Sequence, residues 1–330
     1  MPRLLKASIL ACGVALVVAP VTAAADGLPI DGIDAGPTGV TTPASDVRYV
    51  TLGDGAASTV VAAVRRRGGQ IARYSSLRGA WTVPAVGVDG SPSGLSADGR
   101  TLVLIKPRPG FPRARTPLSV LGTRQLRRRA VIDLRGDFSF DALSPDGRRA
   151  YLIHYTSRRD FTRYEVRALD LRTKRLLPDA IVDPNEEPGE MRGLPVTRVT
   201  SPDGRWAYTL YDGNGKHPFV HALDTVGSRA VCVDLDALEG RKDLYGLRLA
   251  VAEHGGALQV LSARKRPLAR IDTATYTVAA PGATAAAGED GPPIALLVAV
   301  AVLLCGVTAW ALRRRLGGWP SEGSRIVKGS

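Results

Sequence analysis

A short motif that occurs three times is the feature that most constrains the fold. The copies are Leu95–Ile105 (LSADGRTLVLI), Leu143–Ile153 (LSPDGRRAYLI) and Thr200–Leu210 (TSPDGRWAYTL). Asp-Gly predicts a tight turn in each copy, because aspartate accepts hydrogen bonds from the backbone beyond it and glycine tolerates positive φ. The residues after each turn are apolar, β-branched or aromatic, which favours a β-strand.

Each copy belongs to a longer unit. Its turn aspartates, Asp98, Asp146 and Asp203, are 48 and then 57 residues apart. After the strand that follows the turn come a polar loop and two more strand-like segments, at 118–122 and 130–134, at 166–170 and 180–182, and at 220–224 and 230–235. The predicted unit is therefore strand, Asp-Gly turn, strand, hairpin loop, strand, turn, strand. Four antiparallel strands in about 40–50 residues are typical of β-propeller blades.

The Ser-Pro-Asp-Gly-Arg turns and the strands around them resemble the blade repeats of TolB and related WD-type β-propellers, over about residues 87–235. The resemblance implies an architecture and no particular activity. Residues 48–86 and 244–278 contain further strand-like segments without the Asp-Gly-Arg turn, as expected of partial terminal blades. We therefore expect an all-β propeller of about five four-stranded blades over residues 47–278. A β-sandwich with similar turns is the alternative.

The two ends of the chain predict export and membrane anchoring. Residues 1–25 have a basic start, an apolar run and small residues, as in a secretory signal peptide; an uncleaved anchor is the alternative. Residues 294–312 carry no charge and, at about 1.5 Å per residue, nearly match a hydrocarbon core of about 30 Å. Arginines 313–315 place the following end on the cytoplasmic side.

These signals give a domain order. We expect an N-terminal linker at 26–46, a Pro/Gly/Ala-rich tether at 279–293, a transmembrane helix at 294–312 and a basic cytoplasmic tail at 313–330. The protein is then a single-pass protein of the cell membrane with most of its chain extracytoplasmic. A buried core helix is the alternative for 294–312.

Cysteine usage and charge add two constraints. Cys12 lies in the predicted signal peptide and Cys305 in the predicted span, so Cys232 alone remains outside and has no partner for an internal disulfide. The formal net charge is +13 for the whole chain, and 37 basic and 30 acidic residues leave +7 for residues 26–293. This charge favours attraction to anionic surface polymers or lipid headgroups, although a solvated basic surface is the plainer interpretation. Nucleic acid is not an expected partner of an exported domain.

The aligned repeats suggest one place for a ligand. Five residues before each turn aspartate lie Ser93, Asp141 and Arg198, at equivalent positions of the strands expected to line the central channel. Arg248 is the corresponding candidate in the last unit. These four are the predicted ligand-binding residues; a channel wall that is polar only because water fills it is the alternative.

The other polar groups give weaker evidence for a metal-binding or catalytic site. On a continuous strand His217 and His221 would share a face but lie about 13 Å apart, too far to share a metal ion. The acidic group Asp183, Glu186, Glu187 and Glu190 could hold a hard cation, yet solvated loop charge explains it equally. We found no nucleophile elbow, phosphate loop, zinc-protease motif or dinucleotide motif, so no catalytic residue, metal or cofactor is predicted.

The sequence thus favours a membrane-anchored extracytoplasmic propeller that binds a ligand or a protein partner at the cell surface. The alternative is a lactonase-like or other metal- or cofactor-dependent enzyme with its site in the channel. A platform for another membrane protein is a third possibility.

Overall fold

Each Asp-Gly turn of the repeat precedes a strand in the computed structural model, which describes residues 28–30, 33–54, 57–186 and 191–280. Contacts divide the chain into residues 1–281 and 282–330, and every described residue belongs to the first unit. The predicted signal peptide, membrane span and cytoplasmic tail lie outside the described residues, as does most of the tether. Within the described ranges, no helix has the length and apolarity needed to cross a membrane.

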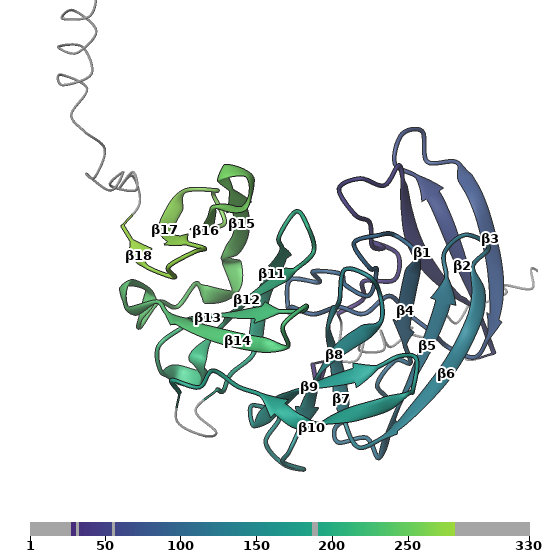
Figure 1. Cartoon of the computed structure of the whole chain (residues 1–330), viewed down its shortest axis with the longest axis horizontal. Helices are drawn as coiled ribbons and strands as arrows, with labels where there is room; N and C mark the ends of the chain where they lie inside the picture. The colour runs from purple at the N-terminus through teal and green to yellow at the C-terminus, as the bar shows by residue number, and fades with distance from the viewer. Residues whose placement is uncertain (1–27, 31–32, 55–56, 187–190, 281–330) are drawn as a thin grey trace, which may run out of the picture. The chain divides into compact units, whose positions relative to one another are not determined.

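The prediction of an all-β fold is confirmed, since the described residues form eighteen strands in five antiparallel sheets and four 3-10 helices (Figure 1). The first three sheets are β1 (Val47–Asp54), β2 (Ser58–Arg65) and β3 (Ile71–Arg78); β4 (Thr101–Ile105), β5 (Arg115–Gly122) and β6 (Arg127–Arg135); and β7 (Phe138–Leu143), β8 (Arg149–Tyr155), β9 (Tyr164–Asp170) and β10 (Arg175–Ile181). The last two are β11 (Pro195–Thr200), β12 (Trp206–Tyr211), β13 (Phe219–Asp224) and β14 (Arg229–Asp234); and β15 (Arg248–Ala252), β16 (Ala257–Leu261), β17 (Pro267–Asp272) and β18 (Val278–Ala279). The 3-10 helices are η1 (Gly213–Gly215), η2 (Asp236–Leu238), η3 (Leu244–Gly246) and η4 (Glu253–Gly255).

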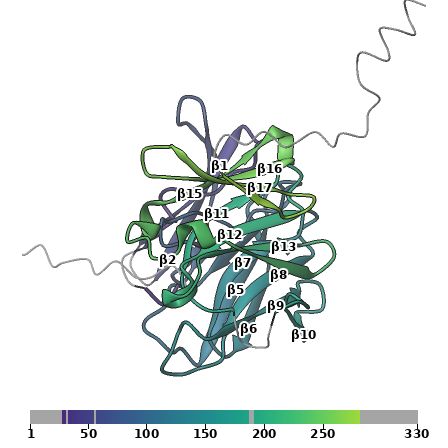
Figure 2. The same cartoon turned by 90° about the vertical axis from the view of Figure 1, so that its left-hand side faces the viewer.

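Buried apolar side chains lie between sheets that follow one another along the chain. Leu104 and Val61 share a cluster between the first and second sheets, and Phe140 packs in the cluster between the second and third. Two clusters fill the space between the third and fourth sheets, and a large one joins the fourth to the fifth. Figure 2 shows the fourth and fifth sheets at the front. Successive antiparallel sheets stacked in this way are the arrangement of propeller blades.

The third and fourth sheets have four strands and the first, at one end of the repeat, has three, as expected. The fifth sheet was expected to be partial but has four strands, and the second was expected to have four but has three. The segment expected to be its first strand pairs with β4 through a single bridge, between Leu95 and Leu102. Gly94 has a φ of +96°, and a Cβ there would collide with the Val103 carbonyl oxygen. This left-handed backbone interrupts the extended conformation that a regular strand needs.

The repeated turns have the conformation that the sequence predicts. Gly99, Gly147 and Gly204 have φ values of +68°, +66° and +74°. Each turn aspartate accepts a hydrogen bond from the backbone nitrogen two residues on, at 2.9–3.0 Å. The serine at the start of each turn donates its hydroxyl proton to that aspartate, at 2.5–2.7 Å, a role that the sequence analysis did not assign. The motif is therefore explained by turn geometry.

Turns of neighbouring sheets also touch each other. The Asp98 backbone nitrogen donates to the Pro145 carbonyl oxygen at 3.0 Å. A Cβ placed on Gly147 would lie 2.6 Å from the Cβ of Thr101, whereas one on Gly99 would have no neighbour within 4 Å. The second and third sheets are thus packed tightly at this end.

This contrast gives a first prediction. Both Gly99→Ala and Gly147→Ala should cost about 1–2 kcal/mol, because an alanine is forced into a left-handed conformation. Gly147→Ala should cost about 1–3 kcal/mol more, because its methyl group also collides with β4. Urea unfolding of the two variants measures the difference, and equal losses would show that the turns do not pack against each other.

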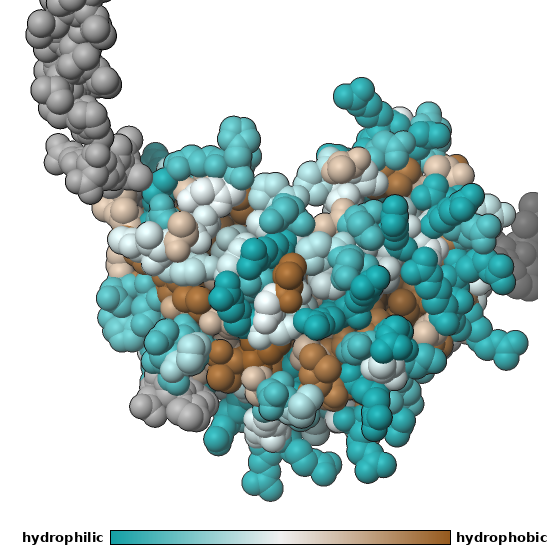
Figure 3. Space-filling view, viewed as in Figure 1, coloured by the Kyte–Doolittle hydropathy of each residue, from teal (hydrophilic) through white to brown (hydrophobic). Residues whose placement is uncertain are grey.

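The face shown in Figure 3 is mostly hydrophilic, and hydrophobic side chains reach it only in small separate groups. A face of this kind is typical of the solvent-exposed surface of a folded domain.

Candidate functional site

A hairpin formed by residues 84–93, here called the crossing hairpin, lies against the fourth sheet although it precedes the second sheet in the chain. Its two arms meet at the bridge between Ala85 and Pro92. The Val88 and Asp89 backbone nitrogens donate to carbonyl oxygens of residues 195 and 196 in β11, at 2.9 and 3.3 Å. The hairpin therefore covers the edge of the inner strand that was expected to face a channel.

Arg198 and Asp141, two of the four predicted site residues, form a buried ion pair between β11 and β7. The exposed fractions of their side chains are 3% and 1%. The Arg198 guanidinium donates to the Asp141 carboxylate, to the Asp141 carbonyl oxygen at 2.9 Å and to the Thr209 hydroxyl at 2.6 Å. Burial lowers the pKa of Arg198 to about 10, which still leaves it charged at neutral pH. The two charges neutralise each other instead of facing water.

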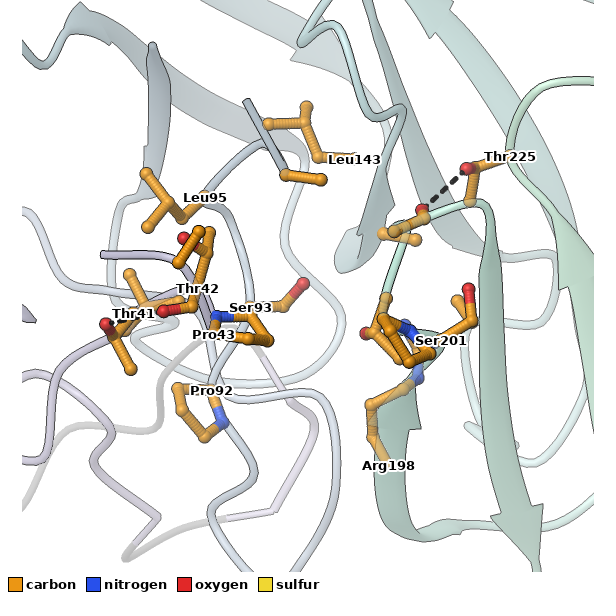
Figure 4. A pocket seen from close by; sticks show the side chains of 18 residues that line it. Thr41, Thr42, Pro43, Pro92, Ser93, Leu95, Leu143, Arg198, Ser201 and Thr225 are labelled. Atoms are coloured by element: carbon orange, nitrogen blue, oxygen red, sulfur yellow. Dashed lines mark hydrogen bonds between the residues drawn. The ribbon is translucent and has the colours of Figure 1, made fainter. Parts of the chain in front are cut away.

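A cavity of about 180 Å³ lies beside this pair (Figure 4). One wall contains Pro43 and Ser93, and the opposite wall contains Arg198 and Ser201. The complete lining is Val40, Thr41, Thr42, Pro43, Ala44, Pro92, Ser93, Leu95, Ala97, Ala142, Leu143, Arg198, Thr200, Ser201, Pro202, Gly204, Ala207 and Thr225. Hydroxyl groups and aliphatic carbons dominate it, and its one cationic group is already paired with Asp141.

The structure therefore brings three of the four predicted residues together. Ser93 and Arg198 line the cavity, and Asp141 reaches it indirectly through Arg198. Arg248 does not line it. Its side chain is half-exposed at the start of β15 and lies 3.5 Å from the carboxylate of Asp89 in the crossing hairpin.

A second buried ionic cluster was missed by sequence reasoning. Asp137 receives hydrogen bonds from the Arg108 guanidinium and, at 2.8 Å, from the Arg113 backbone nitrogen. Arg108 also lies over the ring of Tyr155, 5.3 Å from its centroid, and burial raises the pKa of Tyr155 to about 12. Both arginines come from the irregular segment between β4 and β5, where no periodic pattern marks a buried side chain.

Asp224, at the end of β13, holds the turn next to the cavity and has a fully buried side chain. Burial alone would raise its pKa, but hydrogen bonds from Arg205 and from the backbone nitrogens of Val226 and Gly227 lower it to about 2. Because the ordinary value is 3.8, the ionised form stabilises the folded chain, by about 2 kcal/mol.

This shift predicts a pH dependence. A depressed carboxyl pKa contributes stability that is complete above the ordinary pKa and disappears as the pH falls through the folded value. The Asp224→Asn variant should therefore lose less free energy of unfolding than the parent chain between about pH 5 and pH 2. Urea titrations at a series of pH values measure this, with Asp46→Asn, an exposed site, as the control. An unchanged acid slope in Asp224→Asn would contradict the assignment.

Comparisons with known proteins bear on the fold alone. No family model matches the chain. No curated protein matches its sequence. Among solved structures, hydrazine synthase of Kuenenia stuttgartiensis is 14% identical with a TM-score of 0.45, and the match covers 71% of this chain and 70% of that one. The Swd1 β-propeller domain of Myceliophteria thermophila is 12% identical with a TM-score of 0.42, over 69% and 62% of the two chains.

TolB of Acinetobacter baumannii is also similar, with 16% identity and a TM-score of 0.34, over 71% of this chain and 56% of that one. The chain is thus similar to propeller proteins, including the TolB type that its turns resemble. Since all these TM-scores are below 0.5, the propeller architecture rests on the sheet order and packing described above, and no function is carried over.

Proposed function

We propose that the chain is a membrane-anchored extracytoplasmic propeller, its five sheets forming five blades, that binds a small neutral ligand in the cavity beside Ser93 and Arg198. Residues 294–312 would anchor it, with a short basic tail in the cytoplasm. A protein partner or an anionic surface polymer could be engaged elsewhere on the basic surface.

The observation that carries this proposal is the pairing of Arg198 with Asp141. Without a free charge, the cavity offers hydroxyl groups for hydrogen bonds and aliphatic carbons for contact with a ring. Its volume of about 180 Å³ is close to that of an engineered cavity, of about 150 Å³, that accepts benzene. A single small ring carrying hydroxyl or carbonyl groups fits both the size and the chemistry.

The enzyme alternative draws less support from the same geometry. Its acid or base would have to be Asp141, the acidic residue among the predicted site residues. Asp141 is 1% exposed and its carboxylate is held by the guanidinium of Arg198, so it does not face a substrate in the cavity. Asp141 also fails to line the cavity itself.

The proposal is tested by thermal unfolding of the full-length chain in detergent with neutral monosaccharides and sugar lactones. A compound at 100 times its dissociation constant should stabilise the protein by about 2.7 kcal/mol, which corresponds to a rise of about 5–10 °C in Tm. Ser93→Leu, which fills the cavity, should abolish the rise. Arg248→Gln, at the predicted residue that lies outside the cavity, should preserve it.

Two results would refute the binding site. One is a panel in which no compound raises Tm; the other is a rise that Ser93→Leu leaves intact. A rise with Asp141-dependent turnover of a lactone would instead favour the enzyme.

A further inference from the structure

Three potential metal ligands meet at the side of the fourth sheet, well outside the cavity described above. One carboxylate oxygen each of Asp183 and Glu186 and the sulfur of Cys232 all lie within 4.8 Å of one another. Asp183 and Glu186 follow β10 in the third sheet, whereas Cys232 lies in β14. The fold thus joins groups from two different sheets.

The position of Asp183 is fixed by hydrogen bonds that leave it able to bind a cation. Its side chain is buried, its Oδ2 accepts from the Cys232 backbone nitrogen at 2.8 Å, and its Oδ1 accepts from the Asn185 backbone and side-chain nitrogens at 2.9 and 3.0 Å. Each carboxylate oxygen has two lone pairs, so one remains on Oδ2. Orienting hydrogen bonds of this kind are characteristic of carboxylates that bind metals.

An independent observation is the buried ring of His221. His221 is fully buried, and neither of its ring nitrogens has a hydrogen-bonding partner. Buried polar groups rarely lack hydrogen-bonding partners, so we expect a ligand or a bound water beside this ring.

The sheet register places His221 beside Cys232, on the same face of the fourth sheet. Arg198, Thr209, His221 and Cys232 lie directly opposite one another on β11, β12, β13 and β14, so all four side chains project from the same face. Arg198 reaches Asp141 from that face, which therefore faces the third sheet. His221 consequently lies between the ionic pair and Cys232.

We propose that Asp183, Glu186 and Cys232 bind one divalent transition-metal ion, with His221 beside a water molecule in the fourth coordination position. Sulfur and carboxylate ligands in a four-coordinate site suit zinc(II), and cobalt(II) can replace it as a probe. Glu186 and Cys232 line a cavity of about 480 Å³ that provides the entry path.

The electrostatic environment supports a cation at this place. The carboxylates of Asp183 and Glu186 lie beside the Cys232 sulfur and concentrate negative charge there. His221 offers a ring nitrogen that has no hydrogen-bonding partner and can accept a hydrogen bond from a bound water. A divalent ion would offset the negative charge that these groups otherwise concentrate, and it would displace the thiol proton.

The test uses the full-length chain in detergent with Cys12 and Cys305 replaced by alanine, so that Cys232 is the only thiol. After chelation and dialysis, one equivalent of cobalt(II) should produce visible absorption bands of a four-coordinate site and a sulfur-to-cobalt charge-transfer band. Cys232→Ser should remove the charge-transfer band, and Glu186→Gln should weaken cobalt binding by at least tenfold. Asn185→Ala, which loosens Asp183, should weaken it by about tenfold.

His217→Gln is the matched control, because His217 lines the same cavity but is not one of the three proposed ligands. It should bind cobalt as the parent does. Circular dichroism shows whether each variant is folded. If Cys232→Ser does not fold, the Glu186→Gln variant tests the metal site instead. The proposal is overturned if cobalt produces no sulfur band in the parent, or if binding survives unchanged in a folded Cys232→Ser or Glu186→Gln variant.

Discussion

Replacing Asp137 by alanine is expected to lower the free energy of unfolding by about 5 kcal/mol, the upper end for a broken buried pair. Asp137 is 4% exposed and contacts the guanidinium groups of Arg108 and Arg113, which are 2% and 5% exposed. Burial and the neighbouring Arg108 lower the pKa of Arg113 to about 10, a value at which it keeps its charge at neutral pH. Without Asp137, two buried cations would face each other with no counter-charge.

The measurement is urea unfolding of Asp137→Ala beside Asp133→Ala. Asp133 also pairs with an arginine, Arg115, but both side chains are about half-exposed. An exposed pair of this kind contributes about 0–1 kcal/mol, so the control variant should stay close to the parent. Similar losses in the two variants would mean that the cluster is hydrated in solution.

The second large effect is expected at Asp141. Asp141→Ala should cost about 3–5 kcal/mol, because it leaves the guanidinium of Arg198 buried without its carboxylate. The same reasoning predicts a strong coupling. Replacing both residues by apolar ones of similar volume, as in Asp141→Leu with Arg198→Met, should destabilise less than the sum of the single changes, since no charge remains to be buried.

Urea unfolding of Asp141→Leu, of Arg198→Met and of the double variant, each compared with the parent, gives the coupling energy of this double-mutant cycle. Strict additivity would contradict the pairing. Because Arg198 lines the cavity, ligand binding in the double variant also tells whether its guanidinium contributes to recognition or only supports the wall.

Local signals in the sequence predicted most of the regular structure. The turn around Asp146 and Gly147 could be predicted because turn conformation depends on the residues within the turn. Strands such as β8 and β13 were recognised by their apolar and β-branched residues. The three-stranded second sheet was not foreseen, since the effect of Gly94 depends on its contact with Val103, a neighbour in another segment.

The candidate site was predictable only in part. Repeat alignment placed Asp141 and Arg198 at equivalent positions, and their opposite charges were the available signal that they would pair. The crossing hairpin gave no such signal, because Pro84 and Gly90 indicate a turn without revealing that it would reach β11. Asp183 and Cys232 are distant in the sequence, and they come together only because the segment after β10 packs against β14.

The crossing hairpin also limits how the number of repeat units in this chain can change during evolution. In an ordinary tandem array each unit contacts only its neighbours, so gene duplication or deletion can change the number of units one at a time. Here, Ser91, before the second sheet, accepts a hydrogen bond from the Arg198 backbone nitrogen in the fourth, at 3.3 Å. Inserting or deleting a unit between them would move this partner out of reach. The repeat number between the hairpin and β11 should therefore be inherited as a block, while the terminal units remain free to diverge.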